Sequence, residues 1–263
     1  MPSDNHASPA VPTSPIHSRR FLASAGVTLA VLLTLVGAVA AAGAQGKRAV
    51  VASTCSSPTL YSVTSSSPGP ANWTSSIWSQ PGYPGQGSCD SALDNSSLIT
   101  PITVDTTIPN GLNSLSVGCG SCVIDIASGG QLTVDGTGTI TSGTIHVESG
   151  GTLVVNSNIS FAAGSQLQLS GGTISGAGSV SINGATVTAD GSGTSSVTVP
   201  FNVTAGSVAV NSGTLALSGG GTGNGPFTIA GGATLDFPAS SYALTTGGVV
   251  SGSGTLSVTG GTL

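Results

Sequence analysis

Equivalent apolar residues recur along this chain every 20 to 21 positions. One such column contains Leu132, Leu153, Ile174, Leu215, Leu235 and Leu256, with a step skipped near Ser195, and a second contains Ile140, Phe161, Ile182 and Val203. The short alternating apolar segments between Gly, Asn and Ser are typical of strands. A repeat of this length predicts a solenoid, because a single coil cannot bury its own apolar face. We therefore predict an all-β fold, a single-stranded right-handed parallel β-helix with about 21 residues per coil over residues 98–263.

The composition supports a folded body and excludes some partners. Only 5% of the 263 residues are charged and 38% are hydrophobic, so there is enough apolar material to bury. The four basic residues are Arg19, Arg20, Lys47 and Arg48, all near the beginning of the chain. Binding to phosphate backbones and to anionic membranes needs clusters of Lys and Arg. We therefore expect the body to bind neither nucleic acid nor membrane, and we predict no cofactor.

Residues 1–44 have the pattern of an export segment. Ser18-Arg19-Arg20 precedes an apolar run, and that run ends at the small-residue triplet Ala42-Gly43-Ala44. This order predicts a signal peptide, of the twin-arginine or the ordinary secretory type. An uncleaved anchor is the alternative, because roughly 20 apolar residues suffice to span a bilayer. Both interpretations place the body in the secreted or cell-surface compartment, with the membrane touched only through this segment.

Residues 45–97 are predicted to form a loop-rich N-terminal cap. The four cysteines lie outside the export segment, which in an oxidising compartment predicts two disulfides, Cys55–Cys89 and Cys119–Cys122. A redox or zinc role for Cys-Gly-Ser-Cys is the alternative. The aromatic residues Trp73, Trp78 and Tyr83 are expected to plug the open end of the solenoid, and their alternative role is a stacking surface that binds sugars.

Repeated glycine phrases carry a resemblance to a known class of proteins. These phrases are Gly129-Gly130-Gln131-Leu132, Gly150-Gly151-Thr152-Leu153, Gly254-Thr255-Leu256 and Gly261-Thr262-Leu263. In them, residues 98–263 resemble the parallel β-helix passengers of autotransporters and the filamentous-haemagglutinin-like stalks of bacterial surface adhesins. The resemblance implies a structural or adhesive role. The chain departs from autotransporters because no amphipathic barrel strands follow, and its stop within a repeat phrase leads us to expect a truncated C-terminus.

One set of residues could carry chemistry. Asp105, Asp125 and His146 are spaced by 20 and 21 positions, which predicts one outward column on consecutive coils. Adjacent carboxylates would lie about 5 Å apart, as in retaining glycosidases. The other interpretations are solvated outer residues and weak calcium binding. Chemistry like that of pectate lyases, which needs an Arg or Lys base beside acidic calcium ligands, is excluded because the body contains no Arg or Lys.

We predict no enzyme and no metal site. The predicted function is an exported surface or secreted module that makes weak contacts with carbohydrate or neighbouring surfaces. The alternative is a partial or degenerate polysaccharide-active enzyme that uses the Asp105, Asp125 and His146 column. Ice binding through Thr-x-Thr arrays is a further alternative, but the arrays are not sustained along the repeats.

Overall fold

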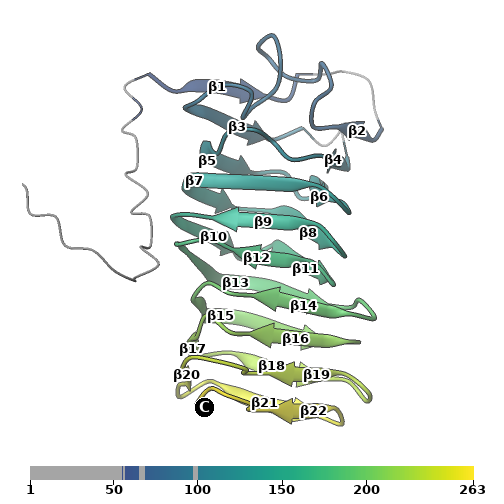
Figure 1. Ribbon diagram of the computed structural model, residues 1–263, viewed down its shortest axis with the longest axis vertical. Coiled ribbons are helices and arrows are strands. Elements are labelled where there is room, and N and C mark those ends of the chain that lie inside the picture. The colour runs from purple at the N-terminus through teal and green to yellow at the C-terminus, as the bar shows by residue number, and fades with distance from the viewer. Residues whose placement is uncertain (1–54, 56, 65–68, 97–99) are drawn as a thin grey trace, which may run out of the picture. The chain divides into compact units, whose positions relative to one another are not determined.

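A computed structural model describes residues 55, 57–64, 69–96 and 100–263. The predicted export segment 1–44 lies outside these residues. The described part belongs to one compact unit, Val50–Leu263. Every regular element in it is a strand, and the 22 strands form one continuous parallel sheet that winds from coil to coil (Figure 1). No helix among the described residues is long and apolar enough to cross a bilayer.

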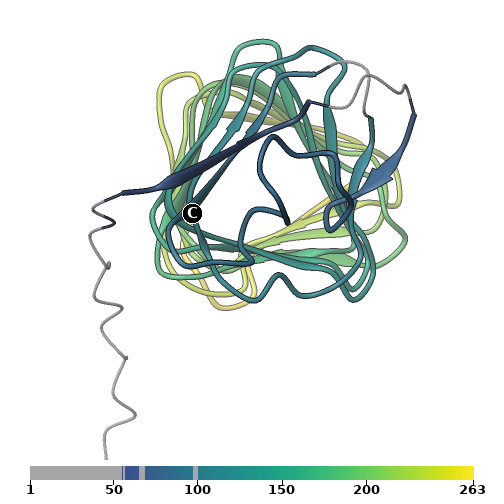
Figure 2. The ribbon, with the colours of Figure 1, turned by 90° about the horizontal axis from the view of Figure 1, so that it is seen from above.

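Three ladders of parallel strands form the sides of the coil, which is roughly triangular when seen from above (Figure 2). Ladder A contains β1 (Thr59–Ser62), β3 (Asp90–Asp94), β5 (Leu112–Val117), β10 (Asn158–Ala162), β17 (Gly221–Gly223) and β20 (Tyr242–Leu244), with parts of β7 (Gln131–Ile140), β13 (Ser179–Ala189) and β15 (Phe201–Val210). Ladder B contains β2 (Ala71–Asn72), β4 (Ile102–Val104), β6 (Val123–Ile126), β8 (Gly143–Glu148), β11 (Ser165–Ser170), β18 (Pro226–Ile229) and β21 (Val249–Gly252), with the second parts of β13 and β15. Ladder C contains the first part of β7, β9 (Thr152–Val155), β12 (Thr173–Ser175), β14 (Thr194–Val197), β16 (Thr214–Leu217), β19 (Thr234–Asp236) and β22 (Thr255–Ser257).

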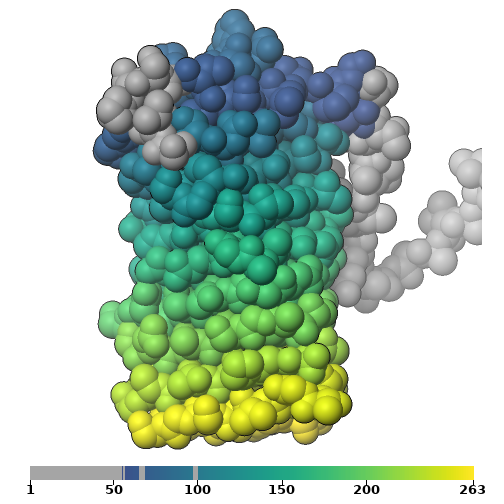
Figure 3. Space-filling model, turned by 180° about the vertical axis from the view of Figure 1, so that it is seen from behind, coloured from purple at the N-terminus to yellow at the C-terminus, as the bar shows by residue number. Residues whose placement is uncertain are grey.

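The predicted β-helix and its repeat length are confirmed. Leu132 pairs with Leu153, and Leu153 pairs with Ile174, each 21 positions further along. Between the other paired strands after the first coil, the step varies from 19, between Val208 and Phe227, to 23, between Phe227 and Val250. The coils lie on one another as successive layers of a solid column (Figure 3).

The predicted leucine column contains a register shift that the sequence spacing concealed. Ile174 pairs with Val197 and not with Ser195, whereas Ser195 pairs with Leu215. The residues expected in one column therefore occupy two neighbouring columns, offset by two positions. Because side chains alternate with a period of two, this offset keeps both columns facing inward. Ser195 is itself buried, and its Oγ accepts a hydrogen bond of 2.9 Å from the Gly171 amide.

The interior is filled by stacked aliphatic and aromatic side chains. Val117, Ile140, Phe161, Ile182 and Val203 follow one another in ladder A, and all are buried. Each of these side chains is removed from water by its neighbours in the coils before and after it. This stacking supplies the hydrophobic stabilisation of the fold, at roughly 25 cal/mol for each Å² of apolar surface buried.

The backbone requires glycine at both positions of each Gly-Gly pair, for a different reason at each position. Gly150 has a φ of 81°, which favours glycine because other residues rarely adopt it. A Cβ on the next residue, Gly151, would collide with the backbone carbonyl oxygen of Ile126 in the preceding coil. The pair Gly129-Gly130 repeats both features one coil earlier. The phrase therefore marks a corner where the chain turns sharply against the coil below it.

Both predicted disulfides are present, and the ladders begin before residue 98, within the region predicted to be a cap. Strands β1 and β3 already pair in parallel, with Leu60 and Ser91 as partners 31 positions apart. The extra length lies in the loop between β2 and β3, which crosses the end of the coil (Figure 2). Disulfides join Cys55 to Cys89 and Cys119 to Cys122. The described part of residues 45–97 therefore contains the first coil of the solenoid.

Candidate functional site

The charged residues of the candidate site lie on the outer side of ladder B. Along β6 and β8, Ile124, Ile126, Ile145 and Val147 are fully buried, as predicted. Alternation along a strand therefore turns Asp125 and His146 outward. The two residues are register partners on neighbouring coils, and Gln168 of β11 follows His146 in the same column.

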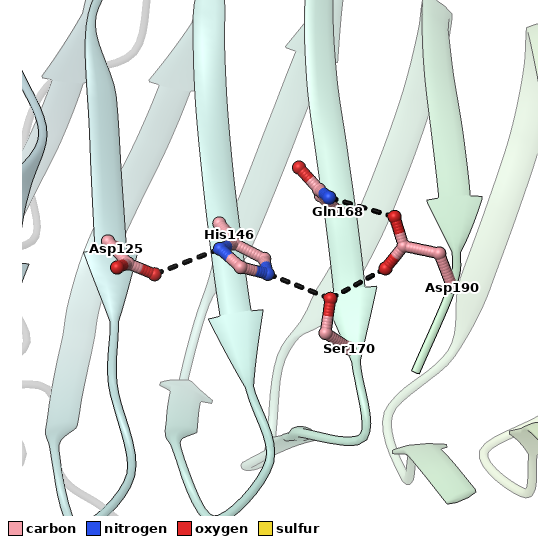
Figure 4. Close-up of polar contacts among 5 residues, drawn as sticks. All are labelled: Asp125, His146, Gln168, Ser170 and Asp190. Carbon is pink, nitrogen blue, oxygen red and sulfur yellow. Dashed lines mark hydrogen bonds and ion pairs between the residues drawn. The ribbon is translucent and has the colours of Figure 1, made fainter. Parts of the chain in front are cut away.

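The side chains of four successive coils are joined in one polar chain (Figure 4). His146 Nδ1 makes an ion-pair contact of 2.9 Å with Asp125 Oδ1, and its Nε2 lies 2.8 Å from Ser170 Oγ. Ser170 Oγ donates a hydrogen bond of 2.6 Å to Asp190 Oδ1. Gln168 Nε2 donates one of 2.8 Å to Asp190 Oδ2. The chain therefore runs from one carboxylate to another through an imidazole and a hydroxyl.

Counting the hydrogens shows which form of His146 satisfies these contacts. Ser170 has one hydroxyl hydrogen, and the short bond to Asp190 uses it. His146 Nε2 must then donate to Ser170, while Nδ1 faces the carboxylate of Asp125. A ring that carries its hydrogen on Nε2 satisfies the contact with Ser170. The arrangement thus places an imidazole between two acidic side chains.

The predicted place of Asp105 in this column is wrong. The register partner of Asp125 on the preceding coil is Thr103. Asp105 lies two residues further along, where its Oδ2 accepts a hydrogen bond of 3.0 Å from Asn72 Nδ2. The step between β4 and β6 is 22 residues and not 20, so the spacing in the sequence misled the prediction. The pair of stacked carboxylates expected for glycosidase chemistry is therefore not formed by Asp105 and Asp125.

The His146 region also has the ligand types of a cation site. Asp125, His146 and Glu148 each offer one ligand atom, and these atoms lie within 4.8 Å of one another. All three side chains are half-buried on the outer face. Carboxylate oxygen and imidazole nitrogen are donors that divalent first-row metals accept. However, His146 Nδ1 and Nε2 are both engaged by protein partners, so metal binding would have to break the polar chain.

The aromatic residues of the cap do not form an open stacking surface. Trp73 is fully buried, and Trp78 is also buried against it, with ring centroids 4.9 Å apart. Their indole N–H groups donate to the carbonyl oxygens of Pro84, at 2.9 Å, and of Trp73, at 2.7 Å. Tyr83 is half-buried and packs against the same core. Trp73 and Trp78 thus have the geometry of a plug and present no open face to a sugar.

Three members of the polar chain were missed by the sequence analysis. Gln168 is the register partner of His146, whereas Ser170 lies two residues further along the same strand and is reached diagonally. Asp190 directly follows β13, in line with Ser170. The spacing in the sequence could have placed Gln168 in this column. It lies 22 residues after His146 and 20 residues before Thr188, so the two steps average 21.

No protein-family model, curated protein or solved structure matched this chain. Its resemblance to bacterial surface adhesins therefore stays a prediction from the glycine phrases. The functional argument rests on the fold and on the outer surfaces of its ladders.

Proposed function

We propose that this protein is an exported structural β-helix of the cell surface or the extracellular space. In this role it holds regular polar surfaces against carbohydrate or neighbouring cells and binds them weakly. The single observation that carries the proposal is the stacking of outward polar side chains in register, coil after coil. Thr194, Thr214, Thr234 and Thr255, for example, are successive partners in ladder C.

The chemistry of these columns suits hydroxyl-rich ligands. Threonine hydroxyls both donate and accept hydrogen bonds, as sugar hydroxyls do. A hydrogen bond that replaces one with water contributes only about 0.5–1.5 kcal/mol. Useful affinity therefore needs many contacts, and a ladder repeated at about 4.8 Å supplies them along one line.

The charge of the body narrows the ligand class. The described residues contain acidic side chains and no Lys or Arg. An anionic polysaccharide would therefore meet repulsion without any compensating cation. We propose neutral or amino-substituted glycans as the ligands. Export is supported by the two disulfides, which use all four cysteines and persist in oxidising compartments.

A glycan array and a cell-adhesion assay on the full chain test the proposal. Two matched variants separate the outer faces: Gln166→Ala with Gln168→Ala on ladder B, and Thr214→Ala with Thr234→Ala on ladder C. We expect weak binding to neutral or amino sugars and a loss of binding in one variant only. Absence of binding to every glycan and cell type would leave a spacer role.

A second candidate function follows from the contacts of His146. The order Asp125, His146 and Ser170 is that of a carboxylate, a base and a nucleophile in hydrolases. Against it, Ser170 gives its hydrogen to Asp190, and His146 donates to Ser170, so the imidazole cannot accept the serine proton. We therefore expect no hydrolysis of neutral polysaccharides or of simple esters. Release of reducing sugar or of an ester alcohol that is lost in Asp125→Ala would favour the enzyme.

A further inference from the structure

The Cys119–Cys122 disulfide lies beside a buried carboxyl group. It closes the turn between β5 and β6, directly after Val117. Val117 is the register partner of Asp94, the last residue of β3. The backbone amide of Gly118 donates a hydrogen bond of 2.9 Å to the Asp94 carbonyl oxygen. The turn is therefore held against Asp94 by the ladder itself.

The two sulfurs have different surroundings. Cys122 has no exposed surface, and its Sγ lies 3.8 Å from the backbone oxygen of Asp94 and 3.7 Å from that of Ser96. Cys119 is only partly buried. Cys119 therefore keeps some exposed surface, whereas Cys122 is enclosed and its sulfur lies near two backbone oxygens. In thiol–disulfide exchange, access is one factor that selects the sulfur that is attacked.

Asp94 provides a proton carrier at the enclosed sulfur. Its side chain is 1% exposed, and its Oδ2 has no hydrogen-bond partner among the described residues. A carboxylate oxygen of Asp94 and the sulfurs of Cys119 and Cys122 lie within 4.8 Å of one another. Burial raises the pKa of Asp94 to about 6, against a smaller lowering by the Ser96 amide. No charged side chain contributes to this shift among the described residues.

We propose that Cys119–Cys122 is an exchangeable disulfide that reacts with thiols and dithiols, with Asp94 as the proton donor to Cys122. A thiolate forms a bond to Cys119 Sγ, and the bond between Cys119 and Cys122 breaks with its electron pair on Cys122 Sγ. The Asp94 proton then passes to that sulfur. A second thiolate attacks the mixed disulfide and releases Cys119, so two thiols are oxidised to one disulfide as this one is reduced.

The experiment measures reduction of the full chain by dithiothreitol between pH 4.5 and 8. Alkylation and peptide mass analysis follow Cys119–Cys122 and Cys55–Cys89 separately in the same sample. Each rate constant is divided by the concentration of the attacking thiolate. We expect the normalised constant for Cys119–Cys122 to rise about tenfold or more as the pH falls through about 6, because a positioned acid contributes at least this much.

Two variants and one internal reference complete the test. Asp94→Asn keeps the shape of the side chain but carries no transferable proton, so its normalised constant should not change with pH. Asp135→Asn, on an exposed carboxylate that accepts from Asn156, should behave as the wild type. The Cys55–Cys89 constant should be flat throughout. A flat wild-type profile, or the same rise in Asp94→Asn, would overturn the proposal, and the wild-type profile decides it if that variant does not fold.

A labelled thiol at limiting concentration tests the direction of attack. The label should be trapped on Cys119 and not on Cys122, because Cys119 has some exposed surface and Cys122 has none. Trapping on Cys122 would overturn the assigned roles of the two sulfurs.

Discussion

Replacing Asp94 by Asn should change how the stability of the β-helix depends on pH. In the folded protein the pKa of Asp94 is about 6, raised by burial from an ordinary value of 3.8. The folded state therefore binds this proton more tightly than the unfolded state does between about pH 4 and pH 6. The free energy of unfolding must then fall as the pH rises through that window. The difference of about 2 pKa units corresponds to about 3 kcal/mol.

Urea unfolding followed by circular dichroism measures this effect. Wild type and Asp94→Asn are compared at pH 4 and pH 7, so that the contributions of the other carboxylates largely cancel. We expect the wild type to lose about 2 kcal/mol relative to the variant between these values, because part of the full effect is already lost at pH 4. Parallel pH profiles for the two proteins would show that Asp94 ionises in the folded state as freely as it does in the unfolded chain.

Three further substitutions test the packing, the corners and the polar chain, each by urea unfolding. Phe161→Ala should cost about 3–5 kcal/mol, because the ring is buried between Ile140 and Ile182, and a loss below about 1 kcal/mol would contradict the stacked core. Gly151→Ala should cost more than about 1 kcal/mol, since its Cβ meets the Ile126 carbonyl, whereas Gly164→Ala has open space and tests only the positive φ. Asp125→Ala should cost about 1 kcal/mol at pH 5 and less in high salt, and an effect independent of salt would argue against the ion pair with His146.

The fold could be predicted from the sequence because a solenoid repeats one physical problem in every coil. Each coil must offer an apolar side chain at the same place, so Leu132 and Leu153 recur with the period of the coil. The repeat length could not reveal a register shift that leaves the apolar side chains facing inward. Between β12 and β14 the partner of Ile174 is displaced by two residues, and both registers place apolar side chains inward. A period of about 21 residues therefore predicts the architecture but not every pairing.

The candidate site was harder to predict because it depends on the exact number of residues between paired strands of neighbouring coils. An error of two residues moved Asp105 out of the column, although the average repeat was right. Ser170 and Asp190 enter the polar chain through the reach of their side chains and their place at the end of strands. Asp94 and Cys122 are 28 positions apart and meet where the chain passes the same corner on successive coils. Such contacts become visible only when the register is known.

Stacking in register also explains why the body carries so few charges. Equivalent side chains on adjacent coils are about 4.8 Å apart, where two like charges repel by about 1 kcal/mol in water and about 3 kcal/mol near a protein surface. In ladder B the column that contains Asp125 continues with His146, Gln168 and Thr188, so no carboxylates are direct neighbours there. The sequence avoids repulsion by placing a base, an amide and a hydroxyl after the acid.

The substitution His146→Asp tests this explanation. It places a carboxylate directly beside Asp125, and also beside Glu148 on the same strand face, whereas His146→Asn removes the imidazole without adding charge. We expect His146→Asp to be about 1–3 kcal/mol less stable than His146→Asn at pH 7. The gap should close near pH 3, where carboxylates are protonated, and it should narrow in high salt. Equal stability of the two variants at pH 7 would mean that outward columns tolerate like charges, and the low charge of the body would then need another cause.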